Sequence, residues 1–167
     1  MRRSEREIAD LQQITEILNR CHVCRVAFAV DREPYIVPLS YGYDPSEQTL
    51  YFHTAASGKK IDCIAENPRV CFEVEGNVEV RPGRNSGCRW TLAYESVIGY
   101  GTISELHGRV NKENGLRILM NQHLEEEADW TFEEAMIGSV RVWRLEIDVN
   151  TVRGKRAPQG SCADRTE

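Results

Sequence analysis

The chain has 167 residues, of which 41% are hydrophobic and 28% charged, and these values are typical of one globular domain with a substantial core. Its formal net charge of −5 argues against a nucleic-acid-binding protein, because contact with a phosphate backbone needs a basic face. No apolar run approaches the roughly 20 residues that span a bilayer, and residues 1–7 lack the apolar segment of a signal peptide, so we expect a cytoplasmic protein with no membrane partner.

The first half of the chain predicts one helix followed by three strands. Ser4 and Glu7 form a capping box, and apolar residues at helical spacing then predict a helix over 5–20. Three β-rich runs follow, separated by two turn segments, at residues 23–30, 35–43 and 49–53. The simplest arrangement of these runs is three consecutive antiparallel strands.

The second half predicts a mixture of short helices and strands. Helices are expected at residues 59–66 and 112–127 from their apolar spacing. Strands are expected at residues 69–75, 93–106 and 140–149, with a loop at 79–87.

These elements predict a mainly β fold, a small barrel of about six antiparallel strands with flanking helices. We expect residues 1–153 to form the domain and residues 154–167 to be a polar, disordered tail. A six-stranded barrel has little room inside, so a ligand should lie on its outside or at a subunit interface.

A short segment after the third predicted strand carries the clearest chemical signal. A strand ending at His53 runs into small and hydroxyl residues, then Gly58, Lys59 and Lys60 at the start of a helix. Hydroxyls such as that of Ser57, backbone amides and two ammonium groups can converge there on a phosphate monoester. The alternative is that both lysines are simply solvated, although cations in a first helical turn oppose the helix dipole.

Five segments in this order resemble the flavin-binding split-barrel superfamily typified by pyridoxamine 5'-phosphate oxidase, in its branch related to nitroimidazole-resistance proteins. The segments are residues 34–43, 50–53, 58–60, 67–72 and 94–101. The resemblance implies a homodimer that holds flavin mononucleotide (FMN) in clefts between its subunits. A small-molecule electron donor and acceptor would be its other partners.

The resemblance also assigns residues to the flavin. The strand expected beside the isoalloxazine ring contributes Tyr35, Ile36, Val37, Pro38, Leu39 and Ser40. The residues expected near the ribityl phosphate are His53, Thr54, Ser57, Gly58, Lys59 and Lys60. Ser96 matches a polar position near the flavin, and Trp90 and Trp143 are further candidates for contact with the flavin or the partner subunit.

Two departures from the oxidase argue against pyridoxamine phosphate as the substrate. The chain has Lys59–Lys60 where the oxidase usually has an arginine–lysine pair, and Ser40 where the oxidase has a basic residue facing its substrate. We therefore expect an FMN-dependent oxidoreductase resembling a nitroaromatic reductase, with His53 as the candidate proton donor.

Two alternatives stay open at this stage. The chain could be a flavin-binding or flavin-sensing module without turnover. It could instead bind haem, with His53 or His107 as axial ligand. Cys21 and Cys24 have C-x-x-C spacing, but a second cysteine-rich half is missing from the sequence, so no metal site is expected.

Overall fold

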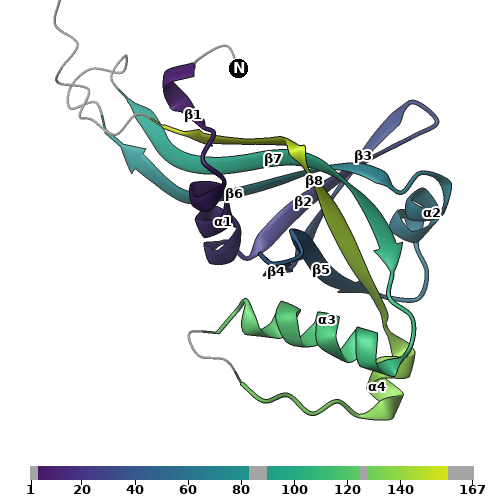
Figure 1. Cartoon of the computed structure of the whole chain (residues 1–167). Coiled ribbons are helices and arrows are strands. Elements are labelled where there is room, and N and C mark those ends of the chain that lie inside the picture. Colours follow the sequence, from purple (N-terminus) through teal and green to yellow (C-terminus); the bar gives the residue numbers. More distant parts are fainter. Residues whose placement is uncertain (1–3, 83–89, 125–127, 158–167) are drawn as a thin grey trace, which may run out of the picture.

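The computed structural model describes residues 4–82, 90–124 and 128–157 (Figure 1). The helical elements are η1 (Ser4–Arg6), α1 (Leu11–Arg20), α2 (Lys59–Glu66), α3 (Arg109–Asn121) and α4 (Glu134–Ser139). The strands are β1 (Glu7–Ile8), β2 (Val23–Val30), β3 (Glu33–Ser40), β4 (Gly42–Asp44), β5 (Thr49–Thr54), β6 (Arg69–Arg81), β7 (Thr91–Glu105) and β8 (Arg141–Arg156).

The eight strands form one antiparallel sheet that curls into a split barrel, as the sequence predicts. The strand order is β3-β2-β6-β7-β8-β5-β4, and β1 pairs with β8. The outermost strands, β3 and β4, are joined in the chain by Tyr41 alone, which is completely buried and donates its hydroxyl to the carbonyl of Leu18 at 2.6 Å. One residue therefore brings the two ends of the sheet together.

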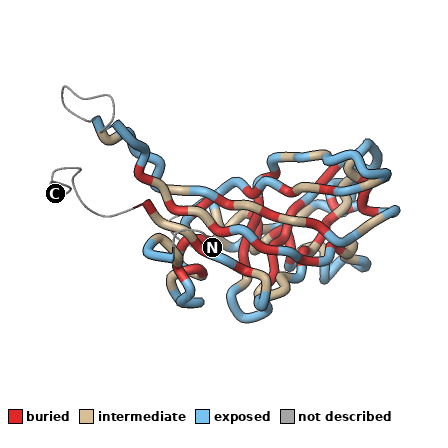
Figure 2. Tube along the Cα trace, turned by 90° about the horizontal axis from the view of Figure 1, so that it is seen from above, coloured by how far each residue is buried: buried red, intermediate tan, exposed pale blue. Residues whose placement is uncertain are grey.

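The core fills the inside of this barrel, and α3 covers part of its outside. Phe28, Phe52 and Phe72 are among the most completely buried side chains of the interior. A smaller cluster forms where Leu116 and Leu119 of α3 lie over Val142 of β8. β8 is thus buried on both faces in this region, and Figure 2 shows the resulting buried segments running through the body of the molecule.

The helix predicted over residues 5–20 is too long at its amino end. The helix begins at Leu11, where the carboxylate of Asp10 accepts the amide of Gln12 at 2.9 Å. Asp10 therefore caps the helix, and the capping box predicted at Ser4 does not form. Ile8 lies instead in a strand, where it packs over Gly154 of β8.

The predicted boundary after residue 153 falls inside β8. The strand continues to Arg156 because residues 153–156 pair with β7, and 154 and 155 also pair with β1. Residues 158–167 of the predicted tail lie outside the described residues.

Three further boundaries differ from the sequence prediction. β6 extends to Arg81, into the predicted loop at 79–87, because its far end pairs with the start of β7. The second long helix lies at 109–121 rather than 112–127. The single run predicted over 35–43 divides at Tyr41 into β3 and β4, which do not pair with each other among the described residues.

Candidate functional site

The chain between β5 and α2 forms an exposed turn that ends in two lysines. We refer to residues 55–60 as the 55–60 turn. Gly58 precedes α2 with φ of 132°, a backbone conformation that glycine adopts without strain, and no side chain caps the helix there. The backbone amides of Lys59 and Lys60, at the start of α2, therefore lie at the same turn as the two ammonium groups of these residues.

Strand β3 lies against this turn. The Nζ of Lys59 is 4.8 Å from the ring centroid of Tyr35 and 3.9 Å from a carboxylate oxygen of Glu33. The far end of α2 contacts the neighbouring strand β2, because Asn67 donates its side-chain amide to the carbonyl of Ala29 at 3.2 Å. The structure thus brings β3 and the 55–60 turn together, and these are the two segments that the resemblance assigns to one flavin.

Strand β3 also has a free edge, because among the described residues it pairs with β2 only. Such an edge presents alternate N–H and C=O groups that can pair with the polar rim of a planar ligand. Ile36, Pro38 and Ser40 point to the exposed side of the strand, whereas Leu39 is buried and Tyr35 and Val37 are half-buried.

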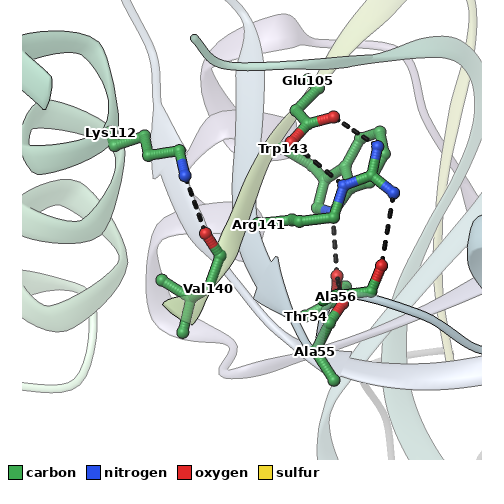
Figure 3. A network of polar contacts seen from close by, with 8 residues as sticks. All are labelled: Thr54, Ala55, Ala56, Glu105, Lys112, Val140, Arg141 and Trp143. Carbon is green, nitrogen blue, oxygen red and sulfur yellow. Dashed lines mark hydrogen bonds and ion pairs between the residues drawn. The ribbon is translucent and has the colours of Figure 1, made fainter. Parts of the chain in front are cut away.

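A buried tryptophan contacts the segment at the start of the turn (Figure 3). The indole N–H of Trp143 donates to Oγ1 of Thr54 at 3.0 Å, and this hydroxyl donates to the carbonyl of Ala55 at 2.8 Å. Trp143 is only 3% exposed and belongs to the barrel core. Trp143 and the side chain of Thr54 therefore support the turn from inside the protein.

An arginine supports the next residue of the turn. Arg141 forms two hydrogen bonds with the carboxylate of Glu105, its guanidinium carbon lies 4.5 Å from the ring centroid of Trp143, and its Nη1 reaches the carbonyl of Ala56 at 3.5 Å. Hydrogen bonding to Arg141 lowers the pKa of Glu105 below its usual value, so the pair is ionised near neutral pH.

Sequence reasoning missed Arg141 and Glu105. Arg141 alternates with apolar residues in the predicted strand over 140–149, a pattern that normally places a charge in solvent. Its partner is 36 positions away in the sequence, and their contact depends on the pairing of β7 with β8.

Three of the predicted site residues lie away from the 55–60 turn within one chain. Ser96 lies nine residues before Glu105 on β7, roughly 30 Å along the strand. Trp90 precedes the same strand and is exposed. His53 is exposed and, as the neighbour of buried Thr54 on β5, points to the other face of the sheet.

The donor set suits a phosphate monoester attached to a planar ring system. It combines backbone amides, a serine hydroxyl and two ammonium groups, with an open strand edge alongside. Within the described part of the chain, no group of three or more His, Cys, Asp or Glu side chains could hold a metal ion. No described helix is long and apolar enough to cross a membrane.

Residues 10–155 match the family model of pyridoxamine 5'-phosphate oxidase. The chain belongs to this family. The superfamily predicted from the five segments is thereby confirmed. A comparison with curated proteins found no match.

Solved structures share this fold. A candidate 5-nitroimidazole antibiotic resistance protein from Bacteroides thetaiotaomicron superposes with a TM-score of 0.75 at 24% identity, over 92% of this chain and 90% of that one. A FAD-binding protein from Mesorhizobium loti gives 0.65 at 28% identity, over 92% and 98%. A FAD- and haem-binding protein from Mycobacterium smegmatis gives 0.80 at 16% identity, over 93% and 75%.

Proposed function

We propose that this member of the pyridoxamine 5'-phosphate oxidase family binds FMN and transfers electrons between a reduced donor and a small organic acceptor. The observation that carries the proposal is the contact between Lys59 and Tyr35, because it joins the phosphate-binding turn to the edge strand. The phosphate would lie at Ser57–Lys60 and the isoalloxazine ring along residues 35–40. The FAD-binding protein at 28% identity supports a flavin ligand.

The chain's own contribution to the chemistry is binding and orientation. Bound flavin would supply the redox chemistry, and hydrogen bonds from β3 would fix its ring and tune its reduction potential. Ser40 is exposed on this strand and provides no charge for a phosphorylated pyridine substrate. An uncharged acceptor such as a nitroaromatic compound fits this surface better. Because His53 points to the other face of the sheet, it could serve as proton donor only at a flavin bound by the partner chain.

We further propose that two chains form a homodimer through the outer face of β3, β2, β6 and β7. Seven large hydrophobic side chains are exposed on these strands: Val23, Ile36, Val78, Val80, Leu92, Ile98 and Tyr100. The strand register aligns Ile36, Ala27, Cys71 and Tyr100 in one row across this face. Burying such a surface favours association, and Ser96, on the same face, would then approach the partner's flavin.

An absorption spectrum tests the cofactor. The protein is saturated with FMN, freed of unbound flavin by desalting and scanned from 300 to about 600 nm, and we expect flavin bands corresponding to about one FMN per chain. A protein that stays colourless contradicts the proposal. A Soret band in the protein as purified would favour haem instead.

Steady-state kinetics then test turnover. With FMN bound, we expect oxidation of a nicotinamide donor that depends on a nitroaromatic acceptor. Bound FMN without any turnover would indicate a flavin-binding module. The His53→Gln variant tests the proton donor, because an unchanged rate with FMN still bound excludes a required acid at this position.

A further inference from the structure

The 55–60 turn is contacted from one side by the buried residues Thr54 and Trp143 and by Arg141, whose side chain is 31% exposed. Three contacts fix it: Trp143 to the hydroxyl of Thr54, that hydroxyl to the carbonyl of Ala55, and Arg141 to the carbonyl of Ala56. Figure 3 shows these partners converging on the turn from one side.

Fixing the carbonyls also fixes the amides. In a planar trans peptide the C=O and N–H groups point in opposite directions. The chain has no cis peptide bond among the described residues, so a carbonyl of Ala56 directed at Arg141 turns the N–H of Ser57 away from the barrel. The N–H of Ala56 is turned outward in the same way by the contact at Ala55.

The guanidinium group of Arg141 is itself oriented by contacts with Glu105 and Trp143. Glu105 accepts from its Nε and Nη2, which leaves Nη1 for the carbonyl of Ala56. The ring of Trp143 lies against the guanidinium plane. Only a planar fork with several donors can make these contacts together, and a lysine ammonium cannot reproduce them.

We propose that Arg141 is a positioning residue that aims the amides of Ala56 and Ser57 at the phosphate of the bound flavin. The inference rests on the proposed function of the turn and deepens it, because it explains how the chain distinguishes a phosphorylated flavin from riboflavin. Arg141 acts through geometry rather than through its charge, because Glu105 neutralises the guanidinium.

Titrations of FMN and riboflavin against four proteins test this role. Arg141→Lys keeps the charge but loses the fork, and the double variant Arg141→Gln with Glu105→Gln removes the contact at constant net charge. Arg144→Lys is the matched control for Arg141→Lys, because Arg144 lies on the same strand and forms an ion pair with Glu146. The wild-type protein is the reference, and circular dichroism verifies that each variant is folded.

We expect both Arg141 variants to weaken FMN binding about tenfold and riboflavin binding less than about twofold, whereas Arg144→Lys changes neither affinity. Equal losses for both flavins would show a merely structural role and overturn the inference. An unchanged FMN affinity would overturn it as well.

Two outcomes separate this inference from the proposed function. If Lys59→Ala with Lys60→Ala weakens FMN selectively but the Arg141 variants do not, the turn binds phosphate without this positioning. If the wild-type protein binds FMN and riboflavin equally, the proposed phosphate site itself is wrong. Should the double variant fail to fold, Arg141→Lys alone decides the matter.

Discussion

The two ends of β7 carry similar charge networks with different consequences. Glu95 near the start of the strand and Glu105 at its end each pair with an arginine of β8, Arg156 and Arg141 respectively. Glu95 also accepts from Asn77 of β6 and from Arg20 of α1. Both networks lie on the sheet, so the difference lies in what each holds in place.

The network of Glu95 is closed in the sense that, among the described residues, its three donors belong to scaffold elements, namely α1, β6 and β8. It fastens α1 and the end of β8 to the long β6–β7 hairpin that extends from the barrel (Figure 1). The network of Glu105 continues through Arg141 into the 55–60 turn, where it meets exposed backbone. Similar pairs of residues therefore stabilise the fold at one end and shape a binding surface at the other.

The largest expected effect on stability comes from Glu95→Ala. It leaves two guanidinium groups without their buried partner, and since both are partly exposed, we expect a loss of about 2–3 kcal/mol in the free energy of unfolding. Urea denaturation measures the loss, with Glu75→Ala as the control because Glu75 is exposed. A loss no larger than in the control would contradict the closed-network description.

Substitutions in the 55–60 turn, beside the network of Glu105, should weaken flavin binding rather than lower the stability of the fold. We expect Lys59→Ala combined with Lys60→Ala to weaken FMN between several-fold and several-hundred-fold, equivalent to about 1–3 kcal/mol, while riboflavin binding changes little. Flavin fluorescence titration gives both constants, and Arg109→Ala combined with Arg117→Ala on α3 serves as the control for the loss of two positive charges. Parallel losses for the two flavins would refute the phosphate assignment.

A pair of stacked histidines outside both networks should make the stability of the fold depend on pH. The rings of His22 and His123 stack with centroids 5.0 Å apart, and burial, together with the neighbouring His22, lowers the pKa of His123. The unfolded chain then binds more protons at His123 between this lowered pKa and about 6.5, so stability falls as the pH falls through that window. Thermal unfolding should show that His123→Gln reduces this acid sensitivity, whereas His107→Gln does not; identical pH profiles for both variants would rule out the contribution.

The smallest expected effect concerns Glu33. Its carboxylate lies 3.9 Å from the Nζ of Lys59 and is exposed, so it competes only weakly with a bound phosphate. Glu33→Gln should tighten FMN about twofold, and Asp31→Asn provides a control with the same charge change in the adjacent turn. A weaker affinity in Glu33→Gln would indicate that Glu33 supports the site.

What the sequence could predict depends on how local the determining signal is. The turn with Gly58 and the helix start at Lys59 follow from neighbouring residues, and α2 has the predicted bounds. The end of β8 could not be predicted, because it depends on pairing with β7, 55–61 positions earlier, and with β1, 146–148 positions earlier.

The side of β8 on which Arg141 lies could not be predicted from the sequence, for a related reason. Val142 is covered by α3 while Trp143 faces the barrel, so both faces of β8 are apolar and alternation no longer tells which side is inside. The proposed homodimer and the proposed acceptor depend on surfaces that the pattern of one chain does not specify.

The most direct test of the central claim is the ratio of the dissociation constants of riboflavin and FMN for the wild-type protein, measured at one ionic strength. If the 55–60 turn binds the flavin phosphate, FMN should bind at least about tenfold more tightly than riboflavin. Equal affinities would show that the turn makes no use of the phosphate and would contradict the account of this site.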